Sequence, residues 1–196
     1  WAREAEVAEA INAGHGNTIF LPNVKLEPGI TATTDIADAV DSIDAVLLVA
    51  PAQHLRAVVS DMAPHLMSNT PVVICTKGIE QGSCALMSEV VTEILPGSPI
   101  AILSGPTFAA EVVSDLPTAV TLATKSVGLG EQLVAAIGTT HFRPYISNDP
   151  VGAQIGGAVK NVLAIACGIV AGRRMGDNAR AALITRGIAE MARLGM

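Results

Sequence analysis

The sequence has few aromatic residues, few charged residues and few cysteines. Aromatic side chains make up 3% of the 196 residues and charged side chains 15%, whereas 50% are hydrophobic. The cysteines show no CxxC or Cys/His spacing, which excludes a zinc-site pattern and a disulfide framework. We therefore expect no metal, and reduced thiols inside the core. The thiols are those of Cys75, Cys84 and Cys167.

A basic surface is also missing. Acidic side chains outnumber lysine and arginine, and the formal net charge is -6. Nucleic-acid backbones select basic faces, so we expect no nucleic-acid partner. A small anionic ligand stays open, because a few local cations or a helix N-terminus can hold one.

No segment reaches the roughly 20 uninterrupted apolar residues that a membrane span needs. The most apolar stretch, residues 151–171, contains Gln154, Lys160 and Asn161. Mean hydropathy is nevertheless positive, at +0.48, as parallel sheets covered on both faces require. We expect a soluble cytoplasmic protein without membrane insertion. The chain starts at Trp1 without an apolar leader, and both of its ends read as cut from a longer protein.

Short apolar runs rich in branched residues alternate with amphipathic stretches. Strands are predicted at 45–50, 71–76, 99–103 and 118–123, with a weaker one at 141–146. Helices are predicted between them, at 53–67, 84–95 and 128–137. Alternation in steps of roughly 25 residues is typical of βαβ units and predicts an α/β fold with a Rossmann-like parallel sheet.

The two ends of the chain fit this scheme differently. A helix at 4–13, a short strand at 30–33 and a helix capped by Asp35 are predicted near the start. Near residue 149 the pattern changes, because only helix is readable from there on, with a break at 172–176. Asp149 is a good N-cap and Pro150 suits the first helical position. We place a dinucleotide-binding domain at 1–148 and the beginning of an all-helical substrate domain at 149–196.

Lys160 is the first residue that indicates chemistry. It lies in a helix so apolar that most of its surface should be buried. A buried, unpaired ammonium is costly, and burial lowers the pKa of a lysine. Gly156 and Gly157 permit another backbone or a ligand to come close. The alternative is that the stem of Lys160 lies on the helix flank while its amine reaches solvent.

Other candidate residues follow neighbouring strands. Pro51 and Lys77 come after two of the strands, and the tight turn at 104–108 comes after the third. Open α/β sheets bind ligands at the carboxyl ends of their strands, and this turn leads into a helix whose first N–H groups can face an anion. A solvated turn lysine and an ordinary helix cap are the alternatives. Taken together with Lys160, these features predict a site at one rim of the sheet.

The chain resembles bacterial NAD(P)-dependent sn-glycerol-3-phosphate dehydrogenases along essentially its whole length. The segments that carry the resemblance are, in order, NTIFLPNVKL, VLLVAP, TKGIE, SGPTFAAEV, LPTAV, GGAVKNVLAIACG and GDNARAALITRGIAEM. The resemblance implies a Rossmann domain followed by a helical substrate domain. It also implies an oxidoreductase that interconverts dihydroxyacetone phosphate and sn-glycerol 3-phosphate, a precursor for glycerophospholipid synthesis.

The resemblance also implies roles for single residues. Lys160 would be the general acid/base that protonates the carbonyl oxygen as hydride arrives. Lys77 would lie beside substrate and nicotinamide and stabilise the developing alkoxide. Gly105 and Thr107 match positions that touch the substrate, and Asn161 would order the polar contacts beside the lysine.

The cofactor residues implied by the resemblance are Pro51, Lys77, Ala109 and Arg3. Ala109 matches a position that touches the cofactor. Arg3 falls where family members hold the adenosine 2′-phosphate, which favours NADP over NAD. An arginine in a frayed N-terminus is the alternative.

Two kinds of protein compete with this interpretation. One is another two-domain NAD(P) dehydrogenase of the 6-phosphogluconate or β-hydroxyacid type, which lacks SGPTFA. The other is a non-catalytic, truncated homologue that acts only by association. Apolar helices left exposed would favour association, and a homodimer is one expectation.

The sequence predicts that this chain by itself binds dinucleotide poorly and does not turn over. It carries no GxGxxG motif, so the phosphate-binding turn of the family is missing, as is the later segment that holds the substrate phosphate. The measurement is the absorbance of reduced nicotinamide after the chain is mixed with cofactor and dihydroxyacetone phosphate. Measurable turnover by the chain alone would contradict the prediction.

Overall fold

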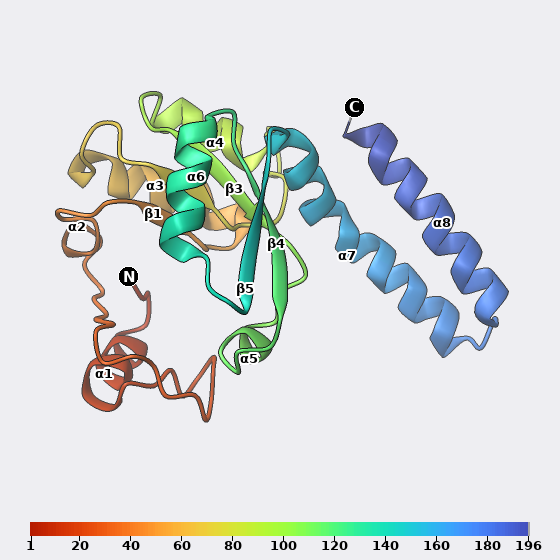
Figure 1. Cartoon of the computed structure of the whole chain (residues 1–196), viewed down its shortest axis with the longest axis horizontal. Coiled ribbons are helices and arrows are strands. Elements are labelled where there is room, and N and C mark those ends of the chain that lie inside the picture. The colour runs from red at the N-terminus through yellow and green to blue at the C-terminus, as the bar shows by residue number, and fades with distance from the viewer. Residues whose placement is uncertain (196) are drawn as a thin grey trace.

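The computed structural model describes residues 1–195, and Met196 lies outside the described residues. A mixed sheet of five strands forms the body of the molecule, and two long helices extend from one side of it (Figure 1). The strands are β1 (Val46–Leu48), β2 (Val72–Ile74), β3 (Ile100–Ser104), β4 (Thr118–Ala123) and β5 (Phe142–Ser147). The helices are α1 (Ala5–Gly14), α2 (Ile36–Ala39), α3 (Ala52–Met62), α4 (Met87–Ile94), α5 (Ala109–Val112), α6 (Val127–Ile137), α7 (Pro150–Gly172) and α8 (Asp177–Leu194), with a 3-10 turn after α3 at Ala63–His65.

The strands predicted between residues 45 and 146 are all present, with ends shifted by at most two residues. The amphipathic helices between them are present too, although α4 begins only at Met87, three residues later than predicted. The α/β class is therefore confirmed. Buried apolar runs and helical periodicity are local properties, so the sequence shows them directly.

The predicted Rossmann-like parallel sheet contains one antiparallel pair. β1, β2 and β3 are parallel and β5 is parallel to β4, but β4 runs antiparallel to β3. The chain between β3 and β4 carries only the four-residue helix α5, whereas parallel neighbours need a longer crossover, usually through a full helix. β4 therefore turns back along β3, which places Thr121 of β4 opposite Ser104 at the carboxyl end of β3.

The strand predicted at 30–33 is also wrong. The Asn12 side chain takes the place of a neighbouring strand: its amide donates to Ala32 O and accepts from Ala32 N, both at 2.8 Å. Ala2 N donates to Thr33 O at 2.9 Å. The backbone polar groups of this segment are thus satisfied without a ladder. The predicted cap on α2 is confirmed, since Asp35 Oδ1 accepts from Ala37 N at 2.8 Å.

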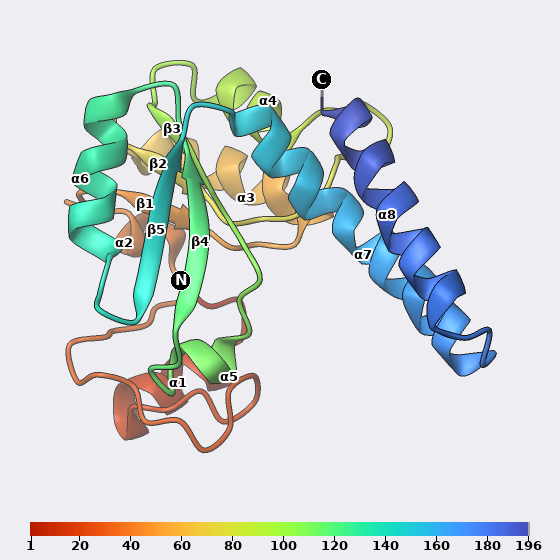
Figure 2. The same ribbon diagram turned by 45° about the vertical axis from the view of Figure 1, so that its right-hand side comes forward.

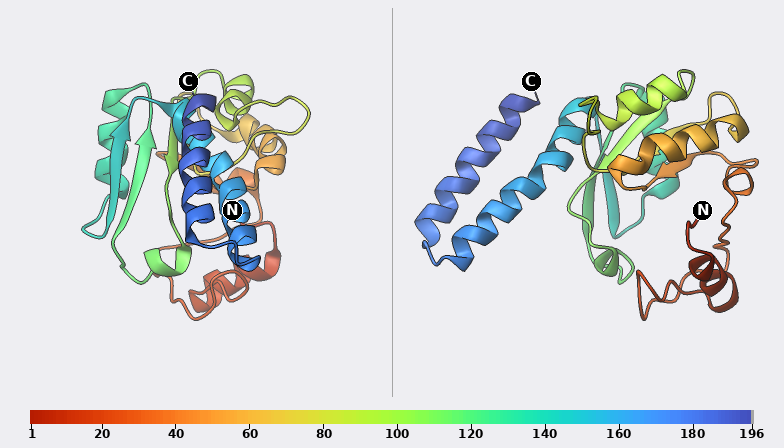
Figure 3. Two further views of the ribbon diagram at one scale, coloured as in Figure 1. Left: turned by 90° about the vertical axis from the view of Figure 1, so that its right-hand side faces the viewer. Right: turned by 180° about the vertical axis from the view of Figure 1, so that it is seen from behind.

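Helices cover both faces of the sheet. Figure 3 shows α3 and α4 together on one face, where Leu55, Val59 and Val90 are fully buried. On the other face Leu129 and Leu133 of α6 pack against apolar residues of β2, β3 and β4. Burial of apolar surface on both faces stabilises the sheet and leaves its rims free to bind ligands.

α7 and α8 form an antiparallel pair beside the sheet (Figure 2). As predicted, α7 has Pro150 at its first turn and Asp149 as its cap, whose Oδ1 accepts from Gly152 N at 2.9 Å. Gly187 of α8 lies so close to Leu163 that a Cβ there would collide with the leucine. The helical structure is interrupted between α7 and α8, within the segment 172–176 where the sequence predicts a break.

The prediction that α7 is buried over most of its surface is wrong for this chain. Only 11% of the most apolar window of α7 is buried. This window has a mean hydropathy of 1.7, so that by length and composition alone α7 is able to cross a membrane. The core helix of a soluble protein meets the same criteria, so this is weak support for a membrane span. Val162, Ile165 and Ile169 are exposed, because α8 and the sheet cover only part of the helix.

The expectation of core thiols is wrong for Cys84. Its side chain is exposed in the loop between β2 and α4, where the backbone has a positive φ of 59°. The helix predicted from this residue has not yet begun there. Cys75 and Cys167 are half-buried.

We predict that the core under α3 tolerates truncation poorly. Val59→Ala, at 0% exposure, removes two buried methyl groups and leaves a cavity, which costs about 1.5–3 kcal/mol of unfolding free energy. The matched change Val127→Ala, at 66% exposure on α6, stays within about 0.5 kcal/mol of the parent. Urea unfolding of the full protein measures both, and equal midpoints would contradict the assignment of the core.

Candidate functional site

A pocket of about 450 Å³ opens at the carboxyl ends of β1, β2 and β3. We call it the rim pocket. Its wall consists of segments 49–52, 75–77 and 103–105, with further residues from β4 and β5. The residues predicted from sequence that line it are Pro51, Lys77, Gly105 and Thr107.

Lys77 reaches across the mouth of β2 to the turn after β3. Its half-buried side chain donates from Nζ to Gly105 O at 2.9 Å. Gly78 allows the chain to leave the strand here, because a Cβ on it would lie 2.5 Å from the Cβ of Ala52 at the start of α3. Lys77 is therefore held at the rim by Gly105 O at its amine and by the packing of the following residue, Gly78, against the start of α3.

Hydrogen bonds anchor the loop after β2 to α3. Gln53 donates to Ile79 O and accepts from Gln81 N, both at 2.9 Å. Arg56, one helical turn further on, pairs with Glu80 at 2.8 Å. Hydrogen bonds from Arg56 and then Ser83 lower the pKa of Glu80 to about 2, so that the carboxylate stays charged. The anchored loop holds the backbone of the neighbouring Lys77 in place.

The sequence-based prediction missed these anchoring residues. Gln53 and Arg56 are three residues apart on the predicted helix, a spacing that places two side chains on one face. That signal shows only that they face the same way. Their partners at 79–81 are identified by the tertiary structure.

α7 crosses the same rim at Gly157. A Cβ on this residue would lie 2.9 Å from Ser104 Oγ and 3.5 Å from Lys77 Cγ, so the absence of a side chain lets the helix come this close. The close approach that Gly156 and Gly157 were expected to permit is thus found at Gly157, where α7 meets Ser104 and Lys77. Gly156 has no atom within 4 Å of its Cβ position, and it takes no part in the approach.

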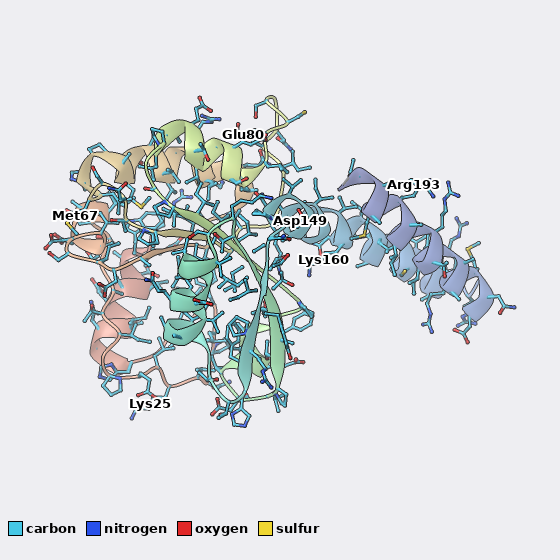
Figure 4. The ribbon with its side chains drawn as sticks, turned by 45° about the horizontal axis from the view of Figure 1, so that its top comes forward. Lys25, Met67, Glu80, Asp149, Lys160 and Arg193 are labelled. Carbon is cyan, nitrogen blue, oxygen red and sulfur yellow. The ribbon has the colours of Figure 1, made fainter. Side chains whose placement is uncertain are left out.

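Lys160 projects from α7 on the side away from α8 (Figure 4). The expectation that it is held out of water is wrong, because this residue is exposed in the present chain. It nevertheless lies only one helical turn beyond Gly157, whose Cβ position is 3.5 Å from Lys77 Cγ, and its charge acts on the Lys77 amine. Burial first, and then the charge of Lys160, lower the pKa of Lys77 below that of an ordinary lysine.

Cys75 is a wall residue that the sequence suggested only as part of the core. Burial raises the pKa of its thiol to about 11, against a smaller opposing effect from the nearby Lys77 ammonium. The thiol is therefore protonated at neutral pH and not a nucleophile. It contributes a small apolar surface to the rim pocket.

The remaining predicted residues lie outside the wall of the rim pocket. Ala109 begins α5, two residues beyond the wall residue Thr107, and is exposed. Asn161 is exposed on α7 beside Lys160, and Arg3 is exposed near the start of the chain. The structure thus brings Pro51, Lys77, Gly105, Thr107 and Lys160 to one rim, and leaves Ala109, Asn161 and Arg3 at its margin or beyond.

Two family models match the chain in succession. The model described as the N-terminus of NAD-dependent glycerol-3-phosphate dehydrogenase matches residues 1–129. The model of the C-terminus of the same family matches residues 149–196. The second match starts one residue before α7.

Curated proteins similar to this chain are named glycerol-3-phosphate dehydrogenases, like the two family models. A glycerol-3-phosphate dehydrogenase (NAD(P)+) from Paramagnetospirillum magneticum is 63% identical over all of this chain, which covers 71% of that protein. One from Rhodospirillum rubrum is 62% identical over all of this chain, which covers 56% of it. The chain thus spans little more than half the length of some curated relatives.

Solved structures agree with the fold. The glycerol-3-phosphate dehydrogenase of Coxiella burnetii superimposes with a TM-score of 0.93 at 38% identity, over 99% of this chain and 59% of its own. The yeast Saccharomyces cerevisiae enzyme gives a TM-score of 0.85 at 32% identity, over 96% of this chain and 56% of its own.

We predict that Lys77 loses its proton at a lower pH than an exposed lysine. Acetic anhydride attacks the neutral amine, so the pH midpoint of acetylation, read on peptides by mass spectrometry, should be lower for Lys77 in the folded protein than in the urea-unfolded protein. Lys160→Gln removes a like charge and should raise the Lys77 midpoint, although burial keeps it below that of the unfolded protein. A midpoint that Lys160→Gln leaves unmoved would show that the two amines are not neighbours in solution.

Proposed function

The chain belongs to the NAD-dependent glycerol-3-phosphate dehydrogenase family, and we propose that its protein interconverts sn-glycerol 3-phosphate and dihydroxyacetone phosphate with NAD or NADP. The observation that carries the proposal is the pair of neighbouring amines, Lys77 and Lys160, at the rim of a nucleotide-binding type of sheet. Two adjacent cations repel each other. Their proximity suits a site in which a substrate oxygen gains negative charge between them.

The rim pocket fits the reactive end of a nicotinamide dinucleotide. Its wall includes small side chains, among them Pro51 and Cys75, at the carboxyl ends of parallel strands, where open α/β sheets bind such cofactors. When bound, the nicotinamide supplies or accepts the hydride. Ala109, at the start of α5, adds a contact at the margin, and Arg3 favours the 2′-phosphate of NADP.

The lysines handle the proton and the charge of the reaction. In reduction, the carbonyl carbon of dihydroxyacetone phosphate gains the hydride while Lys160 gives a proton to the carbonyl oxygen. Lys77 stabilises the charge that develops on this oxygen, and its bond to Gly105 O fixes the direction of the amine. In oxidation of the alcohol Lys160 takes the proton back.

Neighbouring groups place the rest of the substrate. Gly105 and Thr107 offer backbone and hydroxyl contacts from the turn after β3. Asn161 orders polar groups beside Lys160. The substrate is then a small phosphorylated alcohol or ketone held between the turn and α7.

We assign residues 1–148 to the dinucleotide-binding domain and 149–196 to the start of the substrate domain. The end of β5 at Ser147 and the two family-model matches support this division. We further propose a cytoplasmic protein that associates as a homodimer. The exposed apolar side chains of α7 support the association.

The comparisons favour this function over its rivals. The family models and the relatives at 62–63% identity are glycerol-3-phosphate dehydrogenases, which supports this substrate over that of a 6-phosphogluconate or β-hydroxyacid dehydrogenase. A non-catalytic homologue would have no need for two adjacent amines at the rim.

We predict that Lys160→Ala in the full-length protein lowers kcat for dihydroxyacetone phosphate about 10²–10⁴-fold, the usual contribution of a general acid. The assay follows the absorbance of reduced nicotinamide. Lys25→Ala removes an exposed lysine that is distant in sequence from Lys160. It is the control and should match the parent. Equal rates for parent and Lys160→Ala would contradict the proposal. A parent without any nicotinamide-dependent rate would favour the non-catalytic homologue that acts only by association.

The pH profile provides a second check on the same assay. Lys77 stabilises an oxyanion only while it is protonated, and its pKa is below the ordinary lysine value. Activity should therefore be present at neutral pH and fall as the pH rises through this lowered pKa. Lys77→Arg, which stays charged, should shift the alkaline limb of whatever activity remains to higher pH.

A further inference from the structure

Gln154 is a buried polar residue for which the proposed reaction has no direct use. It lies in the second turn of α7 at 4% exposure, and its hydrogen-bonding groups are all occupied. Oε1 accepts from Ser88 N at 2.9 Å. Nε2 donates to Ser88 Oγ at 2.8 Å and to Pro150 O at 3.0 Å. A buried amide with every donor satisfied specifies one orientation of its helix, because other orientations leave polar groups unpaired.

The partner of Gln154 belongs to the rigid body of the molecule. Ser88 lies 66 residues away in sequence, in the first turn of α4. α4 is anchored in the core beneath it, where Met87, Val90 and Val91 are at most 1% exposed. The first N–H groups of a helix need outside acceptors, and Leu86 at the N-cap offers no side-chain oxygen. The amide of Gln154 thus joins α7 to a fixed point and caps α4 as well.

Gln154 lies close to Gly157 on the surface of α7, and Lys160 follows Gly157 further around the helix. At about 100° per residue, Gly157 is rotated about 60° from Gln154, and Lys160 is rotated about 60° further in the same direction. Lys160 is also about 9 Å further along the helix axis. A rotation of the first two turns of α7 would therefore move Gly157 off Ser104 and turn Lys160 away from Lys77.

Apart from the packing of α7 on β3 and β4, where Ile155 is buried, few contacts resist such a rotation. The cap at Asp149 holds only the first turn, and its partner Gly152 belongs to the same helix. α8 packs on α7 and would move with it. The outer turns of α7 are exposed at Val162, Ile165 and Ile169.

We propose that Gln154 is a positioning residue for the hydride-transfer reaction: by binding Ser88 it sets the rotation of α7 that keeps Lys160 beside Lys77. The inference rests on the proposed function for its effect on rate. The geometric part, the proximity of the two amines, is independent of the substrate.

The test compares Gln154→Met with the parent in the full-length protein. Methionine keeps the length of the side chain and removes every hydrogen bond. We expect kcat for dihydroxyacetone phosphate to fall about 10-fold or more, since small misplacements of a catalytic group have effects of this order, while the KM of the nucleotide is unchanged. The pH midpoint for acetylation of Lys77 should rise, because the charge of Lys160 has moved away.

The controls separate positioning from general loss of structure. Gln132→Met makes the same chemical change at an exposed position of α6 and should leave kcat and the Lys77 midpoint at parent values. Ser88→Ala removes only the Oγ acceptor and should give an intermediate effect in a protein that still folds. Circular dichroism and melting temperature show whether each variant folds. If Gln154→Met does not fold, the kcat and the Lys77 midpoint of Ser88→Ala test the inference in its place.

Two outcomes would overturn the inference. One is a folded Gln154→Met variant with parent kcat and parent Lys77 midpoint. The other is a lower melting temperature with no change in either readout, which is the behaviour of a purely structural residue. If the parent itself fails to act on dihydroxyacetone phosphate, the proposed function is wrong, and the acetylation midpoint alone then decides whether Gln154 holds the amines together.

Discussion

The close approach of α7 to the rim of the sheet is the constraint on which the site depends. At Gly157 the helix lies so near that an added Cβ would fall 2.9 Å from Ser104 Oγ. This contact brings two parts of the chain together that are far apart in sequence, the loop after β2 and a helix that begins only at Pro150. Lys77 and Lys160 become neighbours as a result. The glycine matters here because it has no side chain, not because of an unusual backbone angle.

The electrostatics of the rim follow from this approach. Lys77 is half-buried, shares its environment with a second ammonium, and has one fixed acceptor in Gly105 O. Such an arrangement is unfavourable when empty and improves when an oxygen nearby becomes negative. In the proposed reaction such a site would bind the charged transition state better than the neutral carbonyl, which is the condition for catalysis. The anchors on α3 and α4 matter because an error in the placement of either amine would weaken that preference.

Local patterns predicted most of the sheet and its helices. The run at 118–123 is β4 with the same bounds, and Asp35 and Asp149 cap the helices that they were expected to cap. The patterns did not predict the direction of β4, because a short apolar run has the same composition in a parallel and an antiparallel pair. The strand expected at 30–33 failed for a similar reason: the Asn12 amide satisfies that backbone, and such long-range pairing has no local signature.

The sequence by itself determined the α/β class, the family, and the residues with reactive side chains, since composition, periodicity and motif order are properties of the linear chain. Only the tertiary structure decided which of those residues meet. It placed Lys77 against Gly105 and Lys160 near Lys77, kept Arg3, Ala109 and Asn161 out of the pocket wall, and left Lys160 exposed on a helix expected to be buried. It also revealed Gln154 and Ser88 as partners. The physical reason is that burial and proximity depend on what packs against an element, and this is set by contacts between segments distant in sequence.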